Sequence, residues 1–336
     1  MADESCFPGK PETMQTILAE PLFDPADAGL KYLPEGPVSC DQGRISWVAI
    51  QHGAEANLGS LNELDLVSGE NRCWPLPGRP GFAFPTEQHG LFLVGLERHL
   101  YLFDRTTGEC RPVSDEVDQG VEGTIINDAV PFAEGIVLGT KDLAFADQKA
   151  GLYLWRADDQ SLLQLRDDQV CSNGKVIWPD GDSWRLLDID TPTQTVVEYR
   201  LDVRQGTLKE VGVVLDLTDL DIFPDGMVAT ADQRSVVIAF YNPGDAPHGV
   251  VRQYGLATGA LECEWQLPGS PQVTCPLLVE YQGAVQLLAT TAAENMSAER
   301  LALYPRSGCF YAAPTMFKVA PQDYRFVASQ LEGLGG

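Results

Sequence analysis

Four polar residues of this chain recur at similar intervals and could together bind a cation. They are Glu35 in Pro-Glu-Gly-Pro, Asn127 in Ile-Asn-Asp-Ala, Asn173 in Ser-Asn-Gly-Lys and Asp225 in Pro-Asp-Gly-Met. They follow one another after 92, 46 and 52 residues. Two carboxylates and two amide oxygens are hard ligands of the kind that divalent cations prefer. If the fold brings the four together, we expect a site for one divalent metal ion.

Each of these residues alone is ambiguous. Asn-Gly and Asp-Gly are common turn dipeptides, and most of them bind nothing. The hypothesis therefore depends on whether the intervals reflect a structural repeat.

Short apolar runs separated by turn residues dominate the chain and predict an all-β protein. These runs are rich in β-branched and aromatic residues and have the length of strands. Examples are residues 90–96, 99–104, 135–140, 151–155, 195–202, 235–240 and 284–289. The exception is 11–18, for which we expect a short helix.

The turns between these runs recur about every 48 residues. The turn positions are Gly69, Gly108, Gln160, Gly206, Gly259 and Gly308. Six units of this length, each with a few strands, are typical of a six-bladed β-propeller with four-stranded antiparallel blades around a central channel. We expect one such domain over residues 21–330, preceded by an N-terminal extension over 1–20. A β-sandwich with coincidental hairpins is the alternative.

Composition excludes several classes of function. The 336 residues include 48 acidic and 23 basic side chains, for a formal net charge of −25. Nucleic acids and anionic membranes are bound through clustered Lys and Arg, so we expect neither as a partner. The four histidines form no HExxH pair, and the eight cysteines form no CxxC pair, which argues against a zinc site of either kind. Without a recognisable signal peptide or apolar span, we expect a cytoplasmic protein, either a monomer or a small homo-oligomer.

An ordered set of motifs resembles the senescence marker protein/regucalcin/gluconolactonase family of six-bladed propellers. The motifs are Glu35-Gly-Pro-Val38, Ile126-Asn-Asp-Ala129 with Gly139-Thr140, Cys171-Ser-Asn-Gly174 with Asp188-Ile-Asp-Thr-Pro-Thr193, Pro224-Asp-Gly-Met227 with Ala239-Phe-Tyr-Asn242, and Val273-Thr-Cys275. The resemblance extends from Leu33 to Phe310, and the order of the motifs is more specific than any one of them.

The resemblance implies a metal-dependent lactonase that acts on a sugar-acid lactone or a related cyclic ester. Position-for-position matching implies Glu35, Asn173 and Asp225 as metal ligands, with Asn127 beside the metal or substrate. It also implies Asp225 as the general base, with a hydroxide on the cation as the alternative. We expect calcium first, although magnesium, manganese and zinc also bind such ligands.

The chain departs from the family pattern around the substrate. Ile125 stands where some members have a basic side chain, and Lys141 replaces a methionine after Gly139-Thr140. We expect Lys141 to supply the missing basic contact, with Asp128 and Asp142 also near the substrate. A solvated loop lysine is the alternative for Lys141. If the altered substrate contacts abolish turnover, the chain is a non-catalytic metal- or ligand-binding propeller.

Overall fold

The computed structural model describes residues 14–327 and 331, and its strands form six sheets. The strands of each blade are given from the channel outward. Blade 1 contains β3 (Pro34–Ser39), β4 (Arg44–Ala49), β5 (Ser60–Asp65) and β6 (Asn71–Pro75). Blade 2 contains β7 (Pro80–Pro85), β8 (Leu91–Leu96), β9 (His99–Asp104) and β10 (Glu109–Pro112). Blade 3 contains β11 (Thr124–Phe132), β12 (Gly135–Asp142), β13 (Ala150–Arg156) and β14 (Leu162–Gln169).

The second half of the chain repeats this arrangement. Blade 4 contains β15 (Ser172–Asp180), β16 (Ser183–Asp190), β17 (Thr195–Asp202) and β18 (Thr207–Asp216). Blade 5 contains β19 (Phe223–Ala229), β20 (Ser235–Tyr241), β21 (His248–Gly255), β22 (Leu261–Pro268) and, at its outer edge, β1 (Gln15–Leu18). Blade 6 contains β23 (Val273–Tyr281), β24 (Ala284–Thr291), β25 (Phe310–Pro314) and β2 (Glu20–Phe23).

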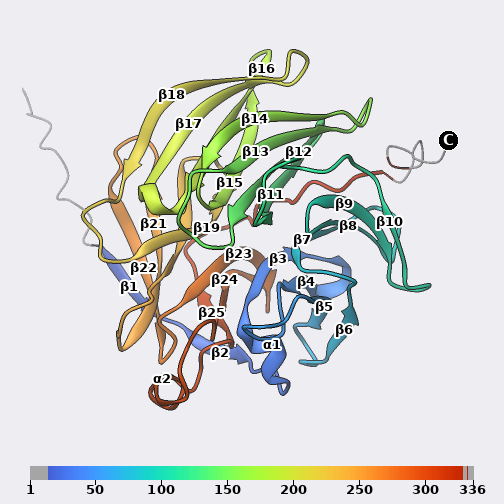
Figure 1. The fold of residues 1–336 in the computed structure, drawn as a ribbon. Coiled ribbons are helices and arrows are strands. Elements are labelled where there is room, and N and C mark those ends of the chain that lie inside the picture. The colour runs from blue at the N-terminus through green and yellow to red at the C-terminus, as the bar shows by residue number, and fades with distance from the viewer. Residues whose placement is uncertain (1–13, 328–330, 332–336) are drawn as a thin grey trace, which may run out of the picture.

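The six blades close into a ring around a central channel (Figure 1). Each innermost strand contacts the innermost strand of the next blade, in the order β3, β7, β11, β15, β19, β23 and back to β3. This arrangement confirms the predicted six-bladed propeller with antiparallel four-stranded blades.

The predicted turn positions adopt the backbone conformation that such turns need. Five of them join the third and fourth strands of blades 1 to 5, and their φ angles are positive. The sixth position, Gly308, also has a positive φ of 86° but precedes β25. Blade 6 has no turn after its third strand, because its fourth strand is β2, from the start of the chain. The prediction that Gly308 is equivalent to the other five turn positions is therefore wrong.

The beginning of the described chain is extended and closes the ring. The short helix expected over residues 11–18 is wrong for 15–18, which form β1; residues 1–13 lie outside the described residues. β1 pairs in parallel with β22, and β2 pairs antiparallel with β25. These pairings satisfy backbone groups on two sheet edges, and this gain overrides the local preference for a helix. β1 thus belongs to blade 5, inside the stretch expected to be an extension.

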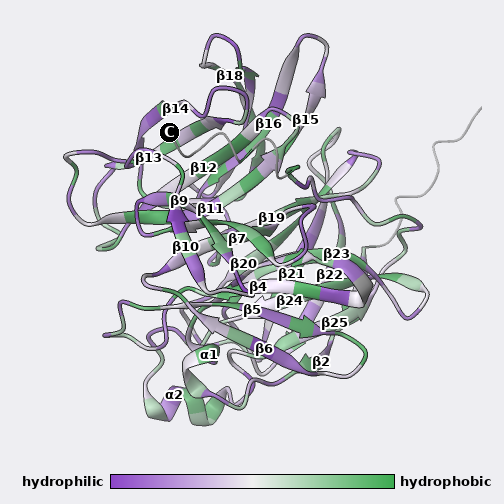
Figure 2. Ribbon diagram, turned by 90° about the vertical axis from the view of Figure 1, so that its right-hand side faces the viewer, coloured by the Kyte–Doolittle hydropathy of each residue, from purple (hydrophilic) through white to green (hydrophobic). Residues whose placement is uncertain are grey.

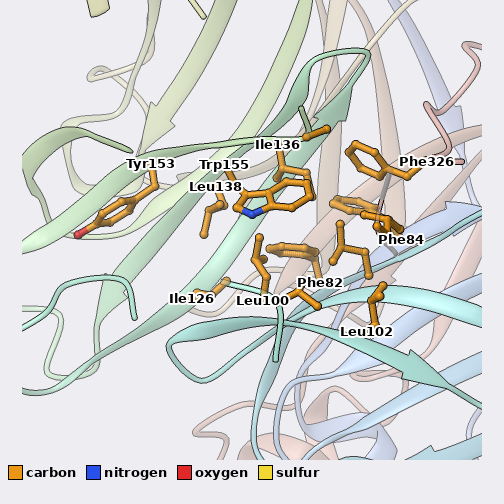
Figure 3. Packing of buried hydrophobic residues seen from close by; sticks show 14 of the residues in the cluster. Phe82, Phe84, Leu100, Leu102, Ile126, Ile136, Leu138, Tyr153, Trp155 and Phe326 are labelled. Carbon is orange, nitrogen blue, oxygen red and sulfur yellow. The ribbon is translucent and has the colours of Figure 1, made fainter. Parts of the chain in front are cut away.

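Hydrophobic side chains fill the spaces between blades. Between blades 2 and 3, the cluster includes Phe82, Leu138 and Trp155, together with Phe326 from the C-terminal segment (Figure 3). The Trp155 and Phe326 rings meet edge to face, with centroids 6.1 Å apart. In Figure 2, hydrophobic stretches lie on strands inside the blades, such as β12, whereas the outer strand β10 is largely hydrophilic.

The helical segments are short and lie outside the blades. They are α1 (Ala28–Tyr32), α2 (Ala298–Leu303) and the 3-10 turns η1 (Asp41–Gly43) and η2 (Thr191–Thr193). Asp27 caps α1 by accepting the Gly29 N–H at 2.8 Å, and Ser297 caps α2 by accepting the Arg300 N–H at 3.2 Å. Within the described residues, no helix has the length and hydropathy of a membrane span.

Candidate metal centre and substrate cavity

An irregularity in strand pairing recurs at one end of every innermost strand. The register with the second strand shifts at Glu35/Val38, Pro80/Phe82, Ile126/Ala129, Asn173/Lys175, Pro224/Met227 and Val273/Pro276. A bulge of this kind locally bends a strand and redirects its side chains. Glu35, Asn127, Asn173 and Asp225 stand at these bulges in blades 1, 3, 4 and 5, so they occupy equivalent places around one channel mouth.

Glycines at three of the bulges allow the innermost strands to approach one another closely. A Cβ on Gly81 would lie 2.3 Å from the carbonyl oxygen of Asn127, and one on Gly174 would lie 2.6 Å from that of Asp225. A Cβ on Gly226 would lie 2.8 Å from the Cα of Cys275 in blade 6. These contacts involve backbone atoms, so no larger residue fits without moving the neighbouring blade.

The channel mouth opens into a cavity of about 730 Å³. Glu35, Asn127, Asn173 and Asp225 all line this cavity, as do Lys141 and Asp142. The cavity thus brings six of the seven predicted site residues together. Asp128, the seventh, is not among the lining residues.

Hydrogen bonds hold the two amide side chains across three blades. The Asn127 amide donates to Asn173 Oδ1 at 2.8 Å and to the Ser172 carbonyl at 3.0 Å. The Asn173 amide donates to Thr191 Oγ1 at 2.8 Å, and this hydroxyl donates to the Pro224 carbonyl at 2.9 Å. Asn127 of blade 3 and Thr191 of η2 therefore fix the orientation of Asn173, and Thr191 is itself held by the backbone of blade 5.

The carboxylates of Asp225, which is buried, and Glu35, which is half-buried, lie near that of Asp128. Burial, followed by the charge of Asp128, raises the pKa of Glu35 to about 8. Burial, followed by the charges of Glu35 and Asp128, raises the pKa of Asp225 well above its usual range. Lys141 lowers both pKa values but does not compensate. The mouth therefore holds more negative charge than its own cations balance.

This donor set fits a divalent cation. Glu35 and Asp225 supply two carboxylates whose repulsion a cation would relieve, and Asn173 supplies a positioned amide oxygen. Among the described residues, no group of three or more His, Cys, Asp or Glu side chains could hold a metal. A metal centre at this mouth therefore requires the amide oxygen.

Lys141 stands directly opposite the position that lacks a basic side chain. It pairs with Ile125 across β11 and β12, and Ile125 itself is buried. No carboxylate of the described chain lies within ion-pair distance of the Lys141 ammonium. Lys141 thus brings a cationic group to the cavity from the strand beside Ile125.

The two remaining predicted substrate contacts have other partners. Asp142 accepts the N–H groups of Ala144, Ala146 and Asp147 at 2.9–3.1 Å and forms an ion pair with Lys149 at 3.1 Å. Burial alone would raise the pKa of Asp142, but these bonds outweigh it and hold the pKa well below the usual range. The carboxylate thereby fixes the loop that follows β12.

Asp128 lies beside a buried lysine. It accepts the N–H of Ala129 at 2.7 Å; burial raises its pKa, and the charge of Lys175 opposes this effect. Lys175 also forms a buried ion pair with Asp188 at 3.3 Å. The charge of Asp128 acts on Glu35 and Asp225 although its side chain does not line the cavity.

Comparison with known proteins agrees with the motifs and the fold. The family model described as "SMP-30/Gluconolactonase/LRE-like region" matches residues 33–293, most of the chain. This chain belongs to that family. L-Arabinolactonase of Azospirillum brasilense is 28% identical over 287 residues, which cover 84% of this chain and 88% of the relative.

Two solved structures show the family fold. The calcium-binding protein regucalcin from Agrobacterium tumefaciens superposes with a TM-score of 0.75 at 21% identity, covering 93% of this chain and 98% of the other. A gluconolactonase from Xanthomonas campestris superposes with a TM-score of 0.57 at 13% identity, covering 88% of this chain and 94% of the other.

Sequence reasoning missed part of the cavity wall of this family member. Thr191, Tyr241 and Glu294 line the cavity but were not expected there. Thr191 and Glu294 follow the second strands of blades 4 and 6, just as Lys141 stands at the end of the second strand of blade 3. These residues all stand at the end of the second strand of a repeat or up to three residues after it, whereas the recurring motif marks only the first strand.

Proposed function

We propose that this family member is a metal-dependent hydrolase that opens a sugar-acid lactone. The observation that carries the proposal is the pair of carboxylates, Glu35 and Asp225, beside the fixed amide of Asn173 in one cavity. The lactonase name of its relative at 28% identity supports the choice of substrate class.

Glu35, Asn173 and Asp225 would hold the metal ion, with calcium as the first candidate. When bound, such an ion polarises the ester carbonyl as a Lewis acid and stabilises the negative charge that develops on its oxygen. The set of oxygen ligands suits calcium, magnesium or manganese better than softer metals.

The chain's own residues would orient the lactone and move the proton. Asp225 would accept a proton from the attacking water at a carboxylate oxygen. Asn127 and Lys141 contact the substrate oxygens, the first as an amide and the second as a cation. Asp142 and Asp128 act indirectly, through the loop after β12 and through charge.

Activity against a panel of sugar lactones, with and without metal, tests this function. Chelated protein should lose hydrolysis of glucono-δ-lactone and regain it when calcium or manganese is added. Asp225→Asn should lower kcat by at least about 100-fold while the circular dichroism spectrum is retained. Equal activity of this variant and the unaltered protein would rule out the assigned site.

The non-catalytic alternative predicts a different pattern. This alternative is favoured by Ile125, a buried apolar residue at a position where some family members have a basic side chain. Calcium binding by calorimetry, combined with no hydrolysis across the panel, would establish a binding propeller instead of a lactonase.

A further inference from the structure

The cavity is larger than a single sugar lactone requires. A monosaccharide lactone has about a dozen non-hydrogen atoms and, at roughly 20 Å³ per close-packed atom, fills on the order of 250 Å³. The cavity has about 730 Å³, nearly three times that volume and within the usual range of ligand pockets. A substrate of one sugar unit would leave much of it filled with water.

The two sides of the cavity belong to opposite blades of the ring. Lys141 belongs to blade 3, and Glu294 follows the second strand of blade 6. In a closed ring of six, blades 3 and 6 face each other across the channel. Lys141 and Glu294 both line the cavity, which therefore extends from one side of the ring to the opposite side.

The end of the cavity at Glu294 is built from polar groups that are already held in place. Tyr241 donates its hydroxyl hydrogen to Glu294 Oε2 at 3.2 Å, and the Gln272 amide donates to the Glu294 carbonyl at 3.0 Å. Tyr32 of α1 donates to Asn295 Oδ1 at 3.1 Å. All five residues line the cavity.

The loop that carries Glu294 is also anchored to the next blade. Arg300 of α2 donates to the carbonyls of Asn242, Pro243 and Gly244, in the loop after β20. It also lies 3.7 Å from the Asp245 carboxylate. The two terminal nitrogens of this guanidinium, which also lines the cavity, thus bind the 242–244 backbone and fix the wall on which Glu294 stands.

Glu294 retains capacity to bind a ligand. Within the described residues it forms no ion pair, and no donor is recorded for its second carboxylate oxygen. A carboxylate with a free oxygen accepts hydrogen bonds from neighbouring hydroxyl groups, and such charge-assisted bonds are among the stronger ones. Tyr, Gln and Asn side chains around it add both donors and acceptors. This combination suits a polyhydroxylated group and disfavours an anionic one.

We propose that the end of the cavity at Glu294 is a second sugar subsite and that the substrate is the lactone of a disaccharide acid. The lactone ring lies at the carboxylate pair, and the glycosidically linked sugar lies against Glu294, Asn295 and Tyr32. Such a molecule has about 23 non-hydrogen atoms and fits the cavity volume by the same packing estimate. This inference rests on the proposed lactonase function.

Calorimetric binding of sugar acids tests the subsite separately from catalysis. In the presence of calcium, the metal-loaded protein is titrated with gluconate, maltobionate and cellobionate, the last two being disaccharide acids. At least one disaccharide acid should bind about tenfold more tightly than gluconate. Glu294→Ala should weaken this binding about tenfold and weaken gluconate binding much less. Glu280→Ala, at an exposed position on β23, is the matched control.

Two outcomes separate the hypotheses. If both disaccharide acids bind no more tightly than gluconate, the subsite does not exist, whatever the protein hydrolyses. If Glu294→Ala weakens binding of all three acids equally, Glu294 belongs to the first subsite and the proposal is also wrong. A failure of the lactonase function shows instead as absent hydrolysis of glucono-δ-lactone by metal-loaded protein.

Discussion

Glu35 and Asp225 destabilise the metal-free protein for the same reason that they suit a cation. Asp225 is buried and Glu35 half-buried, and their charges repel each other and that of Asp128. Residues selected for function commonly cost stability in this way. The effect distinguishes a metal centre from a turn, in which an acidic residue is exposed and costs nothing.

Glu35→Gln should therefore stabilise chelated protein while reducing activity. The folded pKa of Glu35 is about 8, above its unfolded value, so the native state binds more protons between about pH 4.5 and 8. Stability of the metal-free protein should fall as the pH rises through this range. The stability of the variant should depend less on pH, and its free energy of unfolding at pH 7 should be higher by on the order of 2 kcal/mol. Thermal melts in a chelator at several pH values measure both effects, and an unchanged or lower melting temperature for the variant would contradict them.

Lys141 should affect substrate and metal in opposite directions. As a cationic group facing the cavity, it attracts the lactone oxygens and repels a divalent ion. Lys141→Met should raise KM roughly tenfold, with a smaller change in kcat, and should tighten calcium binding a few-fold. Lys209→Met, at an exposed position on β18, is the control. Equal kinetics for the two variants would show that Lys141 does not contact the substrate.

At the scale of the elements, the bulge on each innermost strand is what makes the channel mouth a site. A regular strand would direct alternate side chains into the blade-to-blade packing. The bulges of blades 1, 3, 4 and 5 each direct one polar residue toward the cavity. Glycines at three of the six bulges let neighbouring blades meet backbone to backbone.

Gly174→Ala should damage the site and the packing together. Its Cβ would press on the carbonyl oxygen of Asp225 and on the backbone and side chain of Met227, and we expect a loss of about 1 to 3 kcal/mol. Activity should fall at least tenfold, because Asp225 must move. Gly244→Ala, whose Cβ would meet only the Asn242 side chain at 3.2 Å, should change the free energy of unfolding by less than about 0.5 kcal/mol. Urea unfolding and lactone hydrolysis compare the two, and similar losses in both variants would contradict the close-approach argument.

The same elements show what the sequence could predict. Strands such as β9 and β17 coincide with their predicted ranges, since local apolar alternation and glycine turns suffice to define them. The pairing of β1 with β22 joins residues about 250 apart, and no local pattern encodes it. Glu294 was missed for a related reason: its role depends on facing Lys141 across the ring, which the spacing of one motif does not reveal.

At the scale of the whole molecule, the C-terminal segment ties separate blades together. After β25 it leaves blade 6, and Asp323 accepts the Ser39 N–H in blade 1 at 3.2 Å. The carbonyl of Phe326 accepts the Glu87 N–H in blade 2 at 2.9 Å, while its ring packs on Trp155 of blade 3 (Figure 3). The segment thus spans one face of the propeller, as the red trace in Figure 1 shows.

Phe326→Ala should therefore destabilise the ring as a whole. The side chain is fully buried, and loss of a buried phenylalanine costs about 3 to 5 kcal/mol. Val319→Ala, at a site that is 60% exposed in the same segment, should change stability by less than about 0.5 kcal/mol. Urea denaturation followed by tryptophan fluorescence measures both, and equal midpoints would show that the segment is not part of the core.

The closing of the ring by β1 and β2 has a consequence for biosynthesis. Residues 15–23 leave the ribosome before the other strands of the propeller, but their partners in β22 and β25 are among the last of those strands to be made. β1 and β2 must therefore remain unpaired while the intervening blades are translated. Contacts between such distant residues form slowly, and exposed strands invite wrong pairing in the meantime. We expect the newly made protein to depend on chaperones until its first and last segments meet.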